Sequence, residues 1–146
     1  MKILYLDMDG VLVDIVNSCK AKYGTGLETS ISSLLDTDSE LFLQADPMPG
    51  AIDAYNKLVA KFEVYILTTV PWNNLDAFKA KRLWVEKHLG QPAFKRVITC
   101  HHKNLLRGDY LIDDRTVNGA EKFNGEFIHF GTEEYPDWYS IINYLN

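Results

Sequence analysis

Hydrophobic residues along this chain fall into short runs that alternate with longer stretches in which apolar positions recur at helical spacing. Five short runs bounded by polar residues predict buried strands, at residues 2–6, 64–69, 96–100, 109–114 and 126–130. Three amphipathic stretches predict helices, at residues 52–62, 74–89 and 138–145. This alternation predicts an α/β fold with a mainly parallel sheet, covered on both faces and joined by right-handed crossovers.

One segment, Asp14 to Ala45, interrupts the alternation. Residues 15–23 predict a helix that the following glycines end, and Thr37 to Glu40 has the pattern of a capping box for a second helix through Gln44. We therefore expect a single domain over residues 1–146 with a small helical cap, at about residues 14–45, above the strand ends.

Two carboxylates, Asp7 and Asp9, stand where the first predicted strand ends, and Gly10 follows them. Open α/β sheets bind ligands at the carboxyl ends of their strands, and residues two apart share one face, so both acids can converge on one metal ion and one substrate. An acidic turn is also common without a function. A calcium loop is excluded, because it requires glycine and glutamate where Leu12 and Ser18 stand.

Three later predicted strands also end in polar residues. Thr68 and Thr69 offer hydroxyls and backbone amides for phosphate oxygens, and Lys103 offers a point charge. Asp113 and Asp114 offer the hard oxygen ligands that magnesium prefers. Each has an ordinary structural explanation when it is taken singly: threonine suits strands, lysine suits exposed loops and aspartate caps helices. Their joint occurrence in this order favours a phosphoryl-transfer site.

This order of motifs resembles the haloacid dehalogenase (HAD) superfamily of magnesium-dependent phosphatases. More narrowly, the chain resembles the 5'(3')-deoxyribonucleotidase family through residues 7–12 (DMDGVL), 47–51 (PMPGA), 84–90 (WVEKHLG) and 108–114 (GDYLIDD). The resemblance covers roughly residues 2–15 and 46–118. It implies a HAD-like, Rossmannoid three-layer α/β/α fold and a Mg²⁺-dependent phosphomonoesterase that dephosphorylates deoxyribonucleoside monophosphates.

The resemblance also implies a role for each motif residue. Asp7 would be the nucleophile that forms an aspartyl-phosphate, and Asp9 would be the general acid and base. Thr68, Thr69 and Lys103 would hold the transferring phosphoryl group. The implied Mg²⁺ ligands are Asp7, the backbone carbonyl of Asp9, Asp114, and Asp113 through a water molecule.

The chain departs from the family pattern at three places. An ungapped alignment puts Trp72 where a lysine near the phosphate is expected, and Trp72 offers a flat surface for stacking instead of a charge. Lys81, one turn before Trp84, is a candidate to replace that charge, although a solvated lysine is the simpler interpretation. Ile15 stands where an aromatic residue is expected.

The third departure is the short cap, since the family carries a longer insertion whose aromatic residues grip the base. Tyr23, Phe42 and Leu43 are candidate apolar contacts for a substrate, and equally candidates for holding the cap to the body. This departure leaves open a phosphatase for another small metabolite. A third hypothesis is a binding domain without catalytic activity, since a fold alone does not establish activity.

Composition is consistent with a small enzyme. A chain of 146 residues that is 47% hydrophobic can bury a real core, and its formal charge of −5 argues against binding nucleic-acid polymers or anionic membranes. The amino terminus shows no signal-peptide or membrane-span pattern, so we expect a cytoplasmic protein with Cys19 and Cys100 reduced. The four histidines show no metal-ligand spacing, and we expect no substrate role for His101. The oligomeric state is not predicted.

Overall fold

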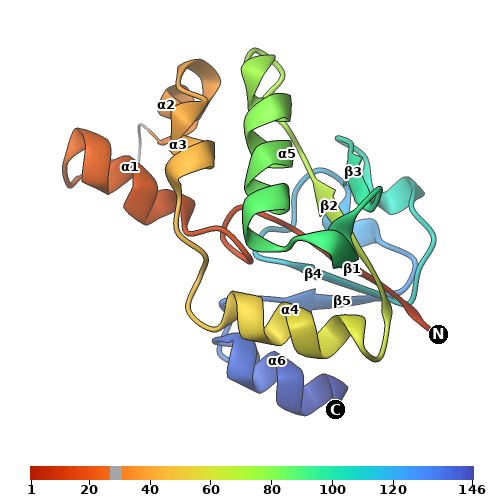
Figure 1. The fold of residues 1–146 in the computed structure, drawn as a ribbon. Helices are drawn as coiled ribbons and strands as arrows, with labels where there is room; N and C mark the ends of the chain where they lie inside the picture. The colour runs from red at the N-terminus through yellow and green to blue at the C-terminus, as the bar shows by residue number, and fades with distance from the viewer. Residues whose placement is uncertain (27–30) are drawn as a thin grey trace.

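Five parallel strands form one sheet in the computed structural model, which describes residues 1–26 and 31–146 (Figure 1). The strands lie in the order β3-β2-β1-β4-β5. Their bounds are β1 Ile3–Leu6, β2 Glu63–Thr68, β3 Val97–Thr99, β4 Tyr110–Asp113 and β5 Glu126–His129. The predicted α/β fold is thereby confirmed, and each predicted strand is present with its ends shifted by at most one residue.

The register of the central strands aligns the polar residues that follow them. Leu6, the last residue of β1, pairs with Ile66 of β2 on one side and with Ile112 of β4 on the other. Because all strands run in parallel, their carboxyl ends meet at one edge of the sheet. Asp7 therefore emerges between the ends of β2 and β4.

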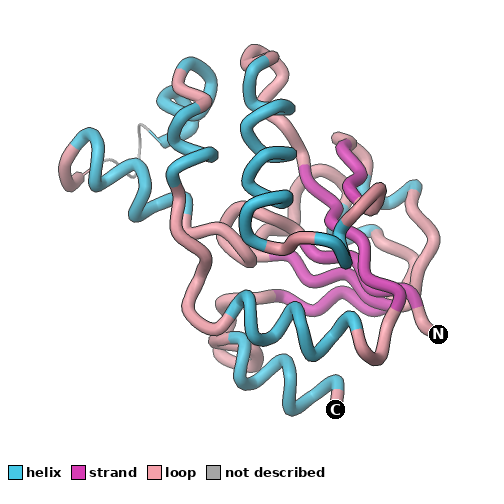
Figure 2. Tube along the Cα trace, viewed as in Figure 1, coloured by secondary structure: helices cyan, strands magenta, loops and turns pink. Residues whose placement is uncertain are grey.

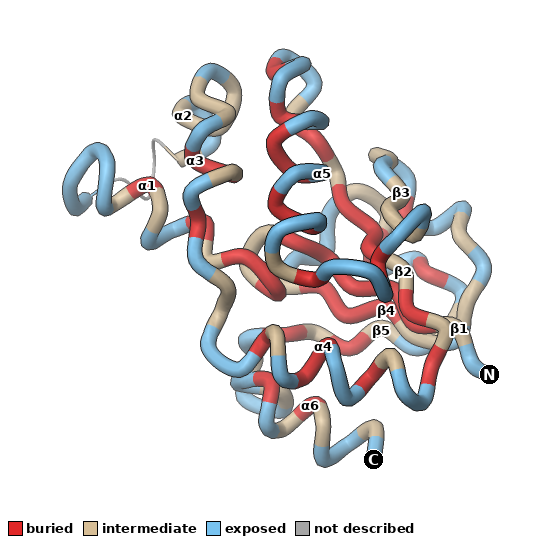
Figure 3. The backbone as a smooth tube through the Cα atoms, viewed as in Figure 1, coloured by how far each residue is buried: buried red, intermediate tan, exposed pale blue. Residues whose placement is uncertain are grey.

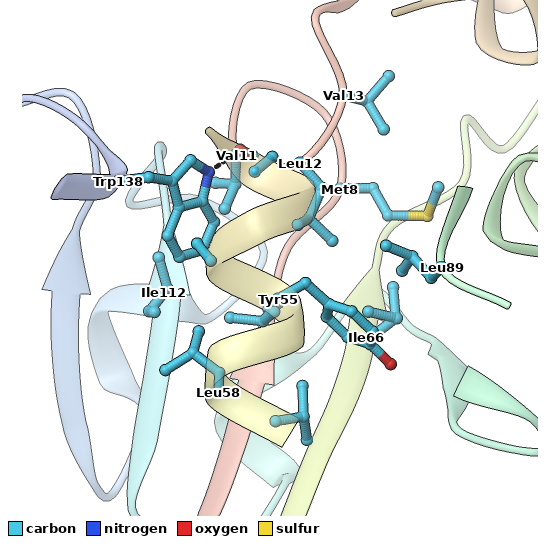
Figure 4. Packing of buried hydrophobic residues seen from close by; sticks show 14 of the residues in the cluster. Met8, Val11, Leu12, Val13, Tyr55, Leu58, Ile66, Leu89, Ile112 and Trp138 are labelled. Atoms are coloured by element: carbon cyan, nitrogen blue, oxygen red, sulfur yellow. Dashed lines mark hydrogen bonds between the residues drawn. The ribbon is translucent and has the colours of Figure 1, made fainter. Parts of the chain in front are cut away.

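Three helices cover one face of the sheet: α4 (Ala51–Val59), α5 (Asp76–His88) and α6 (Trp138–Leu145). Their buried side chains share one core with strand residues such as Leu6 and Ile66. Figure 4 shows Tyr55 and Leu58 of α4 in this core. In the same view the Trp138 indole Nε1 donates a hydrogen bond of 2.8 Å to the Val11 carbonyl oxygen.

The other face of the sheet is covered by two single turns, η2 (Lys103–Leu105) and η3 (Ala120–Lys122), and their loops (Figure 2). Here Tyr5, Leu111 and Phe123 form the centre of a smaller core. The layer on this face is thin because the segments that form it are short. Residues 100–109 and 114–125, ten and twelve residues, must each cross back over the sheet, and such lengths leave little room for a regular helix.

Three helices lie between β1 and α4: α1 (Ile15–Tyr23), α2 (Ile31–Thr37) and α3 (Glu40–Gln44). The first and third agree with the sequence prediction, whereas α2 was not predicted, because its short run ISSLLDT buries no residue fully. Residues 27–30 of the predicted insertion lie outside the described residues. The division of the chain into one body and one cap stays a prediction.

The predicted capping box is wrong. Thr37 is the last residue of α2, and its hydroxyl lies 3.4 Å from the carbonyl oxygen of Ser33, where it bonds back along its own helix. Ser39 precedes α3 without a side-chain cap. Instead, the Asp38 carboxylate accepts a hydrogen bond of 3.1 Å from the backbone N–H of Glu40. A nearer carboxylate therefore takes the place of the predicted threonine.

A second buried cluster joins α1 and α3 to the body. Ile15, Cys19 and Phe42 pack with Val70, before α5, and Ala77, within it. Figure 3 shows the buried segments of α3 and α5 facing each other. Two side chains also bond across this junction: the Trp84 indole donates to the Ala45 carbonyl at 2.8 Å, and the Asn74 amide donates to the Leu35 carbonyl at 2.8 Å.

Within the described ranges, no helix is long and apolar enough to cross a membrane.

The buried hydroxyl of Tyr55 generates a stability prediction. Tyr55 is fully buried, and its hydroxyl has no hydrogen-bond partner among the described residues. Because an unpaired buried hydroxyl costs free energy, Tyr55→Phe should raise the free energy of unfolding by about 1 kcal/mol. Urea denaturation measures this change, with Tyr139→Phe, an exposed tyrosine, as the matched control expected to stay within about 0.5 kcal/mol. A loss of stability in Tyr55→Phe would contradict the unpaired state.

Candidate active site

Three carboxylates converge at the carboxyl ends of β1 and β4. One oxygen from each of Asp7, Asp113 and Asp114 lies within 4.8 Å of the others. Gly10 makes this approach possible: a Cβ at its position would lie 2.0 Å from Oδ2 of Asp114, and its φ of +84° suits glycine alone. The turn that follows Asp9 and the pair that ends β4 therefore fit together only with glycine at position 10.

Lys103 holds two of these acids. Its ammonium donates to Oδ1 of Asp7 at 2.9 Å and to Oδ2 of Asp113 at 2.7 Å, and the residue is only 2% exposed. Burial by itself lowers the pKa of Lys103, but the charges of Asp7 and Asp113 outweigh it and leave the pKa raised. Lys103 is therefore a fixed cation, and two bonds leave one of its three N–H groups free.

Lys81, from the middle of α5, reaches the same site and is 1% exposed. Its ammonium donates to Oδ2 of Asp9 at 2.9 Å, to Oγ1 of Thr68 at 2.8 Å and to the carbonyl of Thr69 at 2.9 Å. These bonds use all three of its donors. The solvated interpretation of Lys81 is thus wrong.

The two threonines at the end of β2 differ in their bonding. The Thr68 hydroxyl accepts from Lys81, so its own hydrogen is left to donate elsewhere. The Thr69 hydroxyl instead donates to the Cys100 carbonyl at 2.8 Å and ties the loop after β2 to the loop after β3. Thr69 still lines the site, where its backbone amide rather than its hydroxyl is the group available to a phosphate.

The acids of this site lie in surroundings that disfavour their charged forms. Burial raises the pKa of Asp9, and the nearby Lys81 ammonium offsets only part of that effect. Burial also raises the pKa of Asp7, against the opposing charge of Lys103. For Asp114, burial and then the charges of Asp7 and Asp113 raise the pKa to about 8. A proton or a cation is therefore favoured among these carboxylates.

The residues fit a divalent metal ion. Asp7, Asp9, Asp113 and Asp114 carry four formal negative charges, whereas the two buried lysines carry two positive charges, which leaves −2. Both oxygens of Asp113 already accept hydrogen bonds, from Lys103 and from the Arg115 amide. Oδ1 of Asp114 is buried and has no partner among the described residues. Oδ1 of Asp9 also has no partner there, but only Asp7, Asp113 and Asp114 bring oxygens within 4.8 Å of one another, so Asp7 and Asp114 are the carboxylates most open to a metal ion.

The free space within the site is small. A cavity of about 70 Å³ is lined by carboxylates, by Thr69 and Lys103, and by Arg115, Val117 and Asn118. Arg115 is exposed and adds a cation at the opening. A space of this size, with hydrogen-bond donors and carboxylates on its walls, suits a single phosphoryl group.

Comparison with known families explains this arrangement. The sequence model of the family described as "5' nucleotidase, deoxy (Pyrimidine), cytosolic type C protein" matches residues 28–136. The chain belongs to the 5'(3')-deoxyribonucleotidase family. The predicted resemblance is confirmed, and with it the assignment to nucleotidases, a class of phosphoric monoester hydrolases.

Individual relatives extend the match to the amino-terminal acids. A protein of Vibrio phage KVP40, provisionally named as a 5'(3')-deoxyribonucleotidase, is 48% identical over 98% of this chain and 84% of its own length. The 5'(3')-deoxyribonucleotidase of Bacillus subtilis is 28% identical over 99% of this chain and 94% of its own length. The human cytosolic enzyme of that name is 37% identical over 69% of this chain and 46% of its own.

Solved structures agree on the fold alone. A HAD-superfamily hydrolase of Geobacter sulfurreducens superposes with a TM-score of 0.66 at 15% identity, covering 100% of this chain and 97% of the other. A haloacid dehalogenase-like hydrolase of Streptococcus pneumoniae gives a TM-score of 0.61 at 14% identity, over 99% and 90% of the two chains. The predicted HAD-like fold is thereby confirmed.

The structure places the two residues that depart from the deoxyribonucleotidase pattern and the three candidate contact residues of the predicted cap. Ile15 is buried in the second cluster, which joins α1 and α3 to α5 and is called the cap cluster below. Phe42 is buried too, with its ring centroid 4.9 Å from the Lys81 ammonium, whereas Leu43 packs at the edge of that cluster. The Tyr23 hydroxyl bonds to Asp38. Trp72 is exposed, and its ring lies 5.8 Å from that of His101.

A buried Lys81 was the less favoured interpretation of the sequence, although the spacing of apolar residues in α5 carries a signal for its burial. The buried positions of α5 are Ala77, Ala80, Lys81, Trp84 and Val85. Lys81 therefore stands within the apolar stripe of an amphipathic helix, where a charge is costly unless it is paired. Arg115 and Asn118 carried no comparable signal, because they lie in a loop whose path depends on the tertiary structure.

The raised pKa of Asp114 generates a prediction about pH. In the metal-free protein Asp114 keeps its proton up to about pH 8, whereas an unfolded aspartate loses it near pH 4. The folded state therefore binds more protons in this window, and its stability should fall as pH rises, by up to about 1.4 kcal/mol per pH unit. Denaturation of the metal-free protein at pH 5 to 8 measures the slope.

Asp114→Asn is the matched control for this slope, because it keeps the shape of the side chain and removes the titration. The difference in slope between the two proteins isolates Asp114 from the other buried acids. Saturating Mg²⁺ should also flatten the slope, since a bound cation would favour the ionised carboxylate. Equal slopes in the wild type and in Asp114→Asn would contradict the assignment.

Proposed function

We propose that this protein is a Mg²⁺-dependent phosphatase that removes the phosphate of deoxyribonucleoside monophosphates through an aspartyl-phosphate intermediate. The observation that carries the proposal is the buried cluster of Asp7, Asp113 and Asp114 around the Lys103 ammonium, in a chain of the deoxyribonucleotidase family. The substrate is a free nucleotide rather than a polymer, which agrees with the net charge of −5. Family membership supports a cytoplasmic location.

Asp7 is the nucleophile in this mechanism. Its Oδ1 is held by Lys103 at 2.9 Å, which orients the carboxylate and leaves Oδ2 to attack phosphorus. Lys103 also has one unused N–H, which can donate to a phosphoryl oxygen as negative charge develops. Nucleophile and cation are thus fixed by one hydrogen bond.

Asp9 acts as the general acid and then as the general base. Burial keeps the pKa of its carboxyl raised, so the protonated form that the leaving oxygen requires is accessible. In the second step the carboxylate, held at 2.9 Å by Lys81, draws a proton from the water that hydrolyses the aspartyl-phosphate. The two adjacent acids therefore divide the roles of nucleophile and proton carrier.

Thr68 and Lys81 position the phosphoryl group together. Because Lys81 donates to the Thr68 oxygen, that hydroxyl presents its hydrogen as a donor to the phosphoryl oxygens. Lys81 has no unused donor, so it acts through its charge and through Asp9 and Thr68. The Thr69 backbone amide supports the same group.

The metal ligands in this proposal are Asp7, Asp114 and the backbone carbonyl of Asp9, with Asp113 acting through water. A bound Mg²⁺ supplies charge neutralisation for the carboxylates and the phosphoryl oxygens. Asp113 fits the indirect role, because hydrogen bonds already occupy both of its oxygens.

A second candidate function is the hydrolysis of another small phosphate ester. The observation that favours it is the small cap, whose aromatic residue Phe42 is buried against Lys81 rather than open to a base. A catalytically silent binding domain is disfavoured by the joint presence of the nucleophile, the proton carrier and both lysines in bonding contact.

The first test is phosphate release from deoxyribonucleoside, ribonucleoside and sugar monophosphates with Mg²⁺. We expect turnover of deoxyribonucleotides, its loss on chelation of the metal, and a fall of more than about a thousandfold in Asp7→Asn. Preference for a sugar phosphate would replace the proposed substrate with the second candidate. Turnover no higher than that of Asp7→Asn on every ester would favour the silent domain.

The role of Lys81 has a separate test. Lys81→Met should lower kcat/KM by about a hundredfold or more, because Thr68 and Asp9 lose their common partner. Lys81 lowers the pKa of Asp9, so its removal should raise that pKa and move the alkaline limb of the pH profile to higher pH. Lys79→Met, an exposed lysine on the same helix, is the matched control. An unmoved alkaline limb would exclude the coupling of Lys81 to Asp9.

A further inference from the structure

The size of the site leaves the nucleoside outside it. The cavity of about 70 Å³ next to Asp7 accommodates a phosphoryl group, and it reaches solvent at its exposed lining residues, Arg115 and Val117, and at the half-buried Thr69. The sugar and base of a nucleotide must therefore lie beyond this opening, against residues of the neighbouring loops or of the cap.

The candidate aromatic residues of the cap are engaged elsewhere. Phe42 is buried in the cap cluster with its ring on Lys81, so neither face is free. The Tyr23 hydroxyl donates to Asp38 at 2.6 Å, and the Lys22 ammonium lies 5.6 Å from the centre of its ring. Base stacking on Phe42 would therefore need its ring to leave the contacts seen here, whereas Tyr23 is 45% exposed and is tied only through its hydroxyl.

The loops at the strand ends offer an alternative surface. Trp72, in the loop between β2 and α5, is 81% exposed. His101, in the loop between β3 and η2, meets it with ring centroids 5.8 Å apart and ring planes at 71°. The two rings thus form an aromatic corner with one wide apolar wall and one wall that carries imidazole nitrogens.

This corner is fixed to the phosphoryl site. Trp72 stands three residues after Thr69, and His101 stands two residues before Lys103, and both of those residues line the cavity. Two hydrogen bonds join the loops: the Thr69 hydroxyl donates to the Cys100 carbonyl at 2.8 Å, and the Cys100 amide donates to the Thr68 carbonyl at 3.0 Å. The aromatic corner is therefore held at the rim of the cavity from both sides.

We propose that the Trp72–His101 corner is the base-binding subsite, in which the nucleobase stacks on the indole and the His101 imidazole hydrogen-bonds to the edge of the base. A nucleobase is the occupant that fits a flat apolar wall meeting a hydrogen-bonding wall, beside a phosphate site too small for the rest of a nucleotide. The inference rests on the proposed function and assigns to His101 a role that the sequence did not suggest. In this proposal the loops after β2 and β3, and not the cap, recognise the base.

Steady-state kinetics test the subsite. Trp72→Ala should raise KM for a deoxyribonucleoside monophosphate about tenfold, within the range for loss of one base–aromatic stack, with little change in kcat. Trp72→Phe should keep most of the affinity, and 2-deoxyribose 5-phosphate, which has no base, should be handled alike by all three proteins. Phe94→Ala, an exposed aromatic residue before β3 at the opposite end of the strands, is the matched control.

Fluorescence gives a second readout. Trp84 and Trp138 are buried, so Trp72 is the exposed tryptophan of this chain. Titration of the inactive Asp7→Asn protein with a deoxyribonucleoside monophosphate should quench the exposed tryptophan signal. The same titration of Asp7→Asn with Trp72→Phe should not, and 2-deoxyribose 5-phosphate should quench neither protein.

The outcomes separate the inference from the proposed function. Absence of nucleotide turnover in the wild type would overturn both. Turnover of nucleotides with an unchanged KM in Trp72→Ala, or an equal rise in KM for the base-free ester, would overturn the subsite alone. If sedimentation showed that Trp72→Ala alters self-association and leaves KM unchanged, the corner would be a contact between copies of the chain and the subsite would be rejected.

Discussion

The rest of this structure depends on the pairing of buried carboxylates with two buried lysines. Buried acids are costly unless they are paired or protonated, and two buried acids, Asp7 and Asp113, meet two half-buried ones, Asp9 and Asp114, at the carboxyl ends of β1 and β4. Lys103 holds Asp7, and Lys81 holds Asp9, at 2.9 Å in each case. Under the proposed function, the same ion pairs that offset the cost of burial also orient the nucleophile and the proton carrier. Stability and chemistry therefore share one set of contacts at this site.

The hydrophobic core packs against the turn that carries part of this cluster. Met8, Val11 and Leu12 bury the turn that carries Asp9 and Gly10, and the indole of Trp138 bonds to the Val11 carbonyl at 2.8 Å. The last helix of the chain therefore braces the first acidic motif. Such packing restricts the movement of a turn whose carboxylates must keep their positions while they are held near one another.

The segment that carries α1 and α3, which is the predicted cap, packs against a lysine of this site. Its buried ring, Phe42, covers Lys81, and Ile15 and Cys19 fill the space against α5. This packing shields the lysine that joins Asp9 to Thr68. The loops after β2 and β3 then present the exposed indole of Trp72 beside His101. Specificity for the leaving group is on this view a property of the strand-end loops.

The sequence by itself determined the five strands, the long helices and the order of Asp7, Thr68, Lys103 and the final acidic pair, because apolar periodicity and motif spacing are local signals. The tertiary structure alone decided the partners of Lys81, since its three acceptors come from two other segments of the chain. It also decided how Trp72 meets His101, because loop contacts depend on packing between distant residues. Local patterns specify which elements form, whereas long-range contacts specify which side chains meet.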